Sequence, residues 1–192
     1  MNSKRSIAVW TMVMVLMAAW FFLQSAVAGE VEKGGIPPAH LAKSYKTLDW
    51  GSPVWDVPEA LACLNAKEKV LWVDTRPASL CAKGTVLDAV VLEYDRSGGE
   101  GNDLTKEKLI AAIQKAGLSA DSAKIAFYCQ GPECHRSYNA SFMAVTQWGF
   151  KPENVIWFRD GYPNLIKDIK ADPKLKRKAA QYLSPSGVKD LD

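Results

Sequence analysis

The sequence has few of the residues that build metal centres and nucleic-acid-binding surfaces. It contains only two histidines, His40 and His135, and its four cysteines are not spaced as a four-ligand zinc site, so we expect no metal and no cofactor. Its 24 basic and 21 acidic residues nearly balance and are spread out. The densest basic run, Lys174 to Lys178, is typical of a solvated helix face, so we expect no nucleic-acid partner.

The amino terminus has the pattern of a secretory signal peptide. Two basic residues precede an uncharged apolar run from Ile7 to Leu23, and Ala26-Val27-Ala28 is a small-x-small cleavage site. We therefore predict a signal peptide over residues 1–28 and export, in a bacterium to the periplasm. The alternative is an uncleaved membrane anchor at residues 7–23, because this run just reaches the length of a membrane span.

Strand-like apolar runs alternate with helical patterns along the rest of the chain. This order predicts a single α/β domain with a doubly wound, mainly parallel sheet and helices on both faces. We expect an extended lead-in at 29–52, the domain at 53–170 and a helical tail at 171–192. One expected strand begins at Val54, and the others span Val70–Asp74, Val86–Leu92, Ile125–Tyr128 and Val155–Phe158. One expected helix ends near Ala66, and the others span Thr105–Ala116, 137–145, Leu165–Ile169 and Pro173–Leu183.

The most informative stretch runs from Ile125 to Ser137. A continuously apolar strand delivers Cys129 into a short polar loop, which opens a helix. Ligand sites of open α/β sheets lie at the carboxyl ends of the strands, where a helix amino terminus favours negative charge. We therefore expect Cys129 to be a nucleophilic thiolate, with Arg136 also lowering its pKa below the free-thiol value of about 8.5 and Glu133 opposing that shift.

The other cysteines allow more than one interpretation in an oxidising compartment. Cys63 fits a small buried apolar residue, and Cys81 lies in a predicted loop, so a bridge between them is allowed by the sequence but not established by it. Cys134 lies in the same loop as Cys129. These two cysteines either form a disulfide or act as an attacking and a resolving thiol.

Three segments together resemble the rhodanese-like domain family, over roughly Val54 to Ile169. They are the strand exit Val73-Asp74-Thr75-Arg76-Pro77, the strand-cysteine-loop-helix at 125–145, and the strand and glycine turn from Val155 to Gly161. The resemblance implies a doubly wound α/β fold and a cysteine, Cys129, that accepts a sulfane sulfur as a persulfide. It also implies that Asp74 and Arg76 support the loop structurally.

The resemblance further implies a substrate-binding loop that ends at Arg136. Its backbone N–H groups would hold an anionic substrate, and the loop residues are Gln130, Gly131, Pro132, Glu133, Cys134 and His135. This loop is longer than is usual for the family and carries a second cysteine. Exported rhodanese-like proteins with a second cysteine in this loop form a subgroup that the chain resembles.

The sequence is compatible with three functions. The first is a sulfurtransferase, thiosulfate sulfurtransferase-like, in which Cys129 takes sulfur from a small anion such as thiosulfate and yields it to a thiol acceptor or partner protein. The second is a thiol-disulfide or persulfide-relay protein, in which Cys134 attacks the adduct on Cys129. The third is a non-catalytic binding module that retains the fold. A phosphatase with Glu133 as acid is less favoured.

Overall fold

The structure is a computed structural model that describes residues 29–191, so the predicted signal peptide and its alternative, the anchor, lie outside the described residues. Its centre is a parallel sheet with the strand order β1-β5-β4-β2-β3. Within the described chain the strands are β1 (Val54–Trp55), β2 (Val70–Asp74), β3 (Val90–Val91), β4 (Lys124–Tyr128) and β5 (Val155–Phe158). The predicted α/β fold with a parallel sheet is therefore confirmed.

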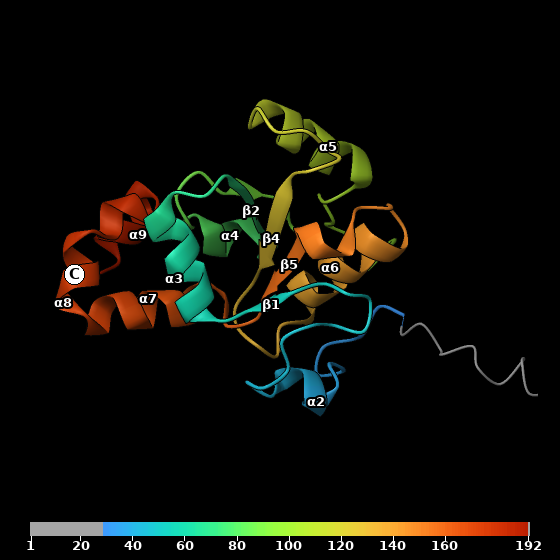
Figure 1. Ribbon diagram of the computed structural model, residues 1–192, viewed down its shortest axis with the longest axis horizontal. Coiled ribbons are helices and arrows are strands. Elements are labelled where there is room, and N and C mark those ends of the chain that lie inside the picture. Colours follow the sequence, from blue (N-terminus) through green and yellow to red (C-terminus); the bar gives the residue numbers. More distant parts are fainter. Residues whose placement is uncertain (1–28, 192) are drawn as a thin grey trace, which may run out of the picture.

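Helices cover both faces of this sheet (Figure 1). One face packs against α3 (Val57–Ala66), α7 (Gly161–Ala171) and the segment beyond it, and the other packs against α5 (Lys106–Lys115) and α6 (His135–Thr146). The remaining helices of residues 29–191 are short: α2 (Pro38–Leu41), α4 (Ala78–Cys81), α8 (Pro173–Arg177), α9 (Pro185–Lys189) and the 3-10 turns Pro152–Asn154 and Ala179–Gln181. No helix of this described part is long and apolar enough to cross a membrane.

The central strand β4 shows why a continuous apolar run forms a strand here. Residues from Ile125 to Tyr128 have no exposed surface, because each face of the strand is covered by one of the two helical layers. Burying such a strand removes apolar surface from water, which stabilises the folded state by about 25 cal/mol for each Å² buried. The carboxyl end of this buried strand is the position from which Cys129 leaves the sheet.

Two expected elements are broken up in the structure, and Cys81, expected in a loop, is the last residue of α4. Of the expected strand Val86–Leu92, only Val90–Val91 pairs in the sheet, because Val86 pairs with Leu183 of the tail and its N–H donates to the Tyr128 hydroxyl at 3.1 Å. The expected helix Pro173–Leu183 is broken after Arg177, where Lys178 leaves the helical conformation with ψ at 6°. The tail is therefore helical as expected, but as the short helices α8 and α9 with a 3-10 turn between them, rather than one continuous helix.

The segment 29–52 is held against the domain by polar contacts along its length, and two sets of them lie near its start and in its middle. The Asn139 side chain accepts from the Val31 N–H at 2.9 Å and donates to the Val31 carbonyl at 2.8 Å. Farther along, the buried Arg159 guanidinium donates to the carbonyl oxygens of His40 and Ala42 at 2.9 and 2.5 Å. Ile36 and Leu48 join Tyr138 and Trp157 in a third apolar cluster. These contacts bring this segment beside α6, the helix that follows the cysteine loop.

Candidate active site

Cys129 is fixed where β4 ends, and only 1% of its surface is exposed. The carbonyl oxygen of Tyr128 accepts from both the N–H and the hydroxyl of Thr75, at 3.0 and 2.9 Å. The carbonyl oxygen of Cys129 itself accepts from the Tyr162 N–H at 3.0 Å. The cysteine is thus held by neighbours that follow β2 and begin α7, which is the site that the sequence predicts at the carboxyl edge of the sheet.

Gly161 allows this close approach of α7 to the loop. Its φ is +67°, and a Cβ there would lie 2.4 Å from the Cys129 carbonyl oxygen and 2.7 Å from the Gly131 nitrogen. An L side chain at this position would be strained by its backbone conformation and by the overlap. The glycine turn that carries part of the family resemblance is therefore a contact with the cysteine loop.

Cys129 and Cys134 form a disulfide in this structure, with their Cα atoms 6.1 Å apart. Cys134 is the N-cap residue of α6, and its side chain makes no cap hydrogen bond within the described chain. The Cys134 side chain therefore does not occupy the N–H groups of the first helical turn, the groups with which helix N-termini bind anions. Of the two alternatives that the sequence leaves open, the structure shows the oxidised pair.

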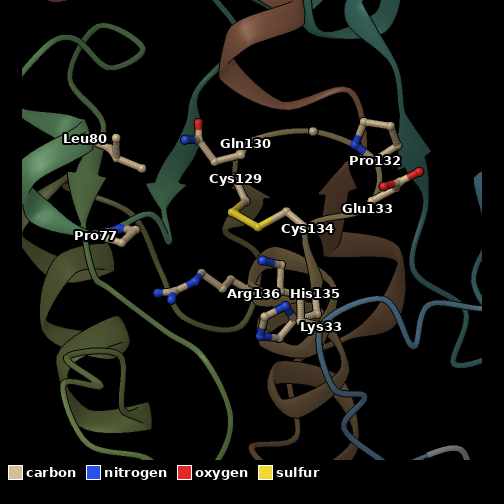
Figure 2. A pocket seen from close by; sticks show the side chains of 11 residues that line it. Lys33, Pro77, Leu80, Cys129, Gln130, Pro132, Glu133, Cys134, His135 and Arg136 are labelled. Atoms are coloured by element: carbon tan, nitrogen blue, oxygen red, sulfur yellow. A yellow bond between two sulfur atoms is a disulfide. The ribbon is translucent and has the colours of Figure 1, made fainter.

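The disulfide lies in a pocket of about 500 Å³. Figure 2 shows Pro77 and Leu80 on one side of the disulfide and Pro132 and Glu133 on the other. All six predicted loop residues, together with Arg136, Lys33, Cys129, Pro77 and Leu80, line this pocket. The structure therefore brings the predicted catalytic and loop residues to one cavity.

Arg136 and His135 are both paired with carboxylates that follow β3. Arg136 lies 3.1 Å from a Glu93 oxygen and 3.5 Å from an Asp95 oxygen, and the His135 Nε2 contacts Asp95. Burial raises the pKa of Asp95, but the hydrogen bond with His135 and the charge of Arg136 lower it more. The Arg136 charge is thus shared with two acids, and its predicted effect on the Cys129 thiol stays a prediction because a disulfide has no thiol proton.

Asp74 and Arg76 form a buried ion pair behind the loop. The Arg76 Nε and Nη2 donate to the Asp74 carboxylate at 2.8 and 2.6 Å, and Nη2 also donates to the Gly84 carbonyl at 2.7 Å. The guanidinium carbon lies 4.3 Å from the centre of the Tyr162 ring. The pair therefore reaches the loop through Tyr162, whose N–H binds the Cys129 carbonyl.

Cys63 and Cys81 are free and buried, so the bridge between them that the sequence allows is not formed. Cys63 packs in the α3 and α7 layer, whereas the Cys81 Sγ donates to the Arg76 carbonyl at 3.5 Å. Burial is the main cause that raises the pKa of Cys63 to about 11 and that of Cys81 to about 12. Both therefore stay protonated and unreactive near neutral pH.

Several residues that line or adjoin the pocket are not among those that the sequence predicts for the site. Glu93 and Asp95 could have been found, because they follow an apolar run at the sheet edge where ligand sites gather. Lys33 lies in the lead-in, and no local pattern points to it. Among residues 29–191, no group of three or more histidine, cysteine or acidic residues is placed to hold a metal ion.

A parallel α/β sheet with a cysteine loop at its carboxyl edge defines the class of protein. The family model for the Rhodanese-like domain matches residues 57–168, and the chain belongs to this family. Membership supports sulfur transfer as the general class of chemistry. No curated protein matches the chain.

Solved structures of other proteins are similar to this chain at low sequence identity. A Saccharomyces cerevisiae protein described as a homologue of single-domain rhodanese and the Cdc25 phosphatase catalytic domain is 15% identical, with 68% of this chain and 86% of that chain covered and a TM-score of 0.49. An As-Sb reductase from Leishmania major is 15% identical, with 62% and 80% covered and a TM-score of 0.46. A thiosulfate sulfurtransferase from Pseudomonas aeruginosa is 14% identical, with 69% and 20% covered and a TM-score of 0.42.

Proposed function

We propose that the protein is a sulfurtransferase that takes sulfane sulfur onto Cys129 and releases it with the help of Cys134. The observation that carries the proposal is the disulfide between these two cysteines, because it places Cys134 within bonding reach of the Cys129 sulfur. A thiol at this distance can attack whatever sulfur species forms on Cys129. This arrangement favours internal release over a reaction that needs Cys129 alone.

The first step starts from the reduced pair. The Cys129 thiolate attacks the outer sulfur of thiosulfate, the sulfur–sulfur bond of thiosulfate breaks, and sulfite leaves with the bonding electrons. Cys129 then carries a persulfide, whose negative charge faces the amino terminus of α6. The pocket around Cys129 is large enough for a small anion.

The second step uses Cys134. The outer sulfur of the persulfide takes up a proton from water, the Cys134 thiolate attacks the Cys129 Sγ, the bond from Cys129 to the outer sulfur breaks, and hydrosulfide leaves with the bonding electrons. The outer sulfur gains two electrons, and the two cysteines lose two as they form the disulfide. A dithiol reductant must restore both thiols before the next turnover. In the alternative transfer reaction, an external thiolate removes the outer sulfur and Cys134 takes no part.

The proposed location follows from the predicted signal peptide. Export would place this chemistry in the periplasm of a bacterium, where cysteine pairs tend to be oxidised. The disulfide is then the resting state, and activity depends on a supply of reducing equivalents. This location and the membrane-anchored alternative can be separated by the mass of the mature protein.

A single-turnover experiment tests the proposal. Wild-type protein is reduced with dithiothreitol, separated from it without oxygen and mixed with thiosulfate, after which sulfite, hydrosulfide and the mass of the loop peptide are measured. We expect equimolar sulfite and hydrosulfide together with the Cys129–Cys134 disulfide. Cys134→Ser should release sulfite but keep a persulfide on Cys129, and Cys129→Ser should release neither product.

Cys63→Ala is the matched control, since it removes a buried thiol outside the pocket. This variant should give the same products as the wild type. Hydrosulfide release by Cys134→Ser at the wild-type level would show that release is not internal. Absence of sulfite from the reduced wild type would rule out sulfur transfer from thiosulfate and favour a binding module.

A further inference from the structure

The two sulfurs of the disulfide differ in their access to a partner. Cys129 is 1% exposed and lies at the buried end of β4, whereas Cys134 is partly exposed at the start of α6. Both line the pocket, so a small anion can reach Cys129 once the disulfide opens. A thiol carried by a protein needs the more exposed sulfur, because its approach is limited by the surrounding backbone.

A second effect acts in the opposite direction. The N-cap position favours the thiolate form of Cys134, which would make Cys134 the better leaving group and direct attack to Cys129. Leaving-group preference matters only if the attacking sulfur can make contact. Since the Cys129 carbonyl is held by Tyr162 and its side chain is buried, access decides in favour of Cys134.

The chemistry also selects the kind of reductant. Attack on Cys134 frees the Cys129 thiolate within bonding reach of the new mixed disulfide, so Cys129 can attack it and expel a monothiol. A dithiol competes with this reversal because its own second thiol is equally close. The apolar side chains at the rim, Pro77, Leu80 and Pro132, suit contact with a protein surface.

We propose that a protein dithiol reduces the disulfide by attacking the Cys134 sulfur. The attacking thiolate forms a bond with Cys134 Sγ, the Cys129–Cys134 bond breaks, and Cys129 leaves as a thiolate. The second thiolate of the partner then attacks the partner sulfur of the mixed disulfide, and Cys134 leaves as a thiolate. The partner loses two electrons and becomes a disulfide. This inference rests on the proposed function for its biological purpose.

A trapping experiment identifies the attacked sulfur. Oxidised wild-type protein is mixed with a thioredoxin that retains only its attacking cysteine, quenched with N-ethylmaleimide and mapped by mass spectrometry. We expect the mixed disulfide on Cys134 and the alkyl group on Cys129. A mixed disulfide on Cys129 would overturn the inference, and so would failure of thioredoxin to react with protein that dithiothreitol reduces.

A rate comparison supplies an independent readout. Cys129→Ser and Cys134→Ser each keep one loop cysteine, which is loaded with thionitrobenzoate and then mixed with intact dithiol thioredoxin. We expect release of thionitrobenzoate from Cys134 to be at least ten times faster than from Cys129. Equal rates would contradict the inference. Cys63 and Cys81 should take up no label before unfolding, because both are buried.

The outcomes separate this inference from the proposed function. Sulfite release is measured on protein reduced with dithiothreitol and does not depend on which sulfur a protein reductant attacks. If reduced protein released sulfite but thioredoxin formed its mixed disulfide with Cys129, only the inference about Cys134 would be overturned. Attack on Cys134 without sulfite release would overturn the proposed function and leave a thiol-disulfide exchange protein.

Discussion

The backbone N–H of Tyr162 donates to the carbonyl oxygen of Cys129 at 3.0 Å, and Gly161 lies directly before it. This contact joins the start of α7 to the first residue of the cysteine loop. A change in α7 at Gly161 must therefore move the loop or break the bond. The geometry of the disulfide site therefore depends on α7, which is separated from the loop in sequence by α6, a 3-10 turn and β5.

Gly161→Ala should lower the free energy of unfolding by about 2 kcal/mol or more, because both the left-handed backbone and the overlap with the Cys129 carbonyl oppose a Cβ. Urea unfolding measures the loss. Gly149→Ala is the matched control, since Gly149 has a φ of +78° but open space around its Cβ position. The free energy of unfolding of Gly149→Ala should fall by only about 1 kcal/mol. Equal losses would contradict a close contact at Gly161.

Asp74→Asn should destabilise the protein by about 3 kcal/mol or more, because it leaves the buried Arg76 charge without its partner. Asp103→Asn breaks an exposed pair with Lys108 and should change stability by no more than about 0.5 kcal/mol. Thermal or urea unfolding distinguishes the two variants. A similarly small effect of both would show that the ion pair does not stabilise the fold.

Stability should fall in acid as Asp56 takes up a proton. Burial raises the pKa of Asp56, but hydrogen bonds from Arg159, Lys43 and Lys46 outweigh it and lower the pKa from 3.8 to about 2. Because the folded state holds this proton less tightly than the unfolded state, the stabilisation is present above pH 3.8 and is lost as the pH falls toward 2.

Urea unfolding between pH 5 and about pH 2 checks this linkage. Asp56→Asn should be less stable than the wild type at the upper end, and the difference should shrink as the pH falls. Asp121→Asn, at an exposed position, should follow the wild-type curve. A constant difference between Asp56→Asn and the wild type would mean that the carboxylate charge is not the source of the stability.

Glu93→Gln should strengthen the binding of an anionic substrate, because it removes one of the two carboxylates that share the Arg136 charge. Freeing about 1 kcal/mol of attraction would lower the KM for thiosulfate about fivefold, and Arg136→Gln should raise it. Steady-state assays with a dithiol acceptor measure both. Glu153→Gln, at an exposed position outside the pocket, is the control and should leave the KM for thiosulfate unchanged. If Glu93→Gln and Arg136→Gln both had the wild-type KM, Arg136 would be excluded from anion binding.

The sequence predicts the buried parts of this fold well. β2 and β5 have the expected bounds, because an uninterrupted apolar run is sufficient to indicate a strand covered on both faces. β4 begins one residue earlier than expected, at Lys124, which is exposed and therefore does not belong to the apolar run. The start of α6 is less predictable. Cysteine is not a preferred N-cap residue, so the expected helix begins at Ser137 rather than at His135.

The candidate site is predicted in its local part only. Cys129, Cys134 and the rest of the loop are neighbours in sequence, so one motif brings them together. Lys33 reaches the same pocket through the packing of the lead-in on α6, which depends on contacts such as the one between Val31 and Asn139. Pairing across such a distance in sequence is set by tertiary structure and leaves no periodic pattern.

The docking of the lead-in on α6 has a practical consequence for work on this protein. Gly29 is four residues from Lys33, which lines the disulfide pocket, so an affinity tag fused before Gly29 would start next to the cavity. The other end of the chain lies on the far side of the molecule from the lead-in (Figure 1). Fusions for capture assays and surface immobilisation therefore belong at the carboxyl end, where they leave the pocket open.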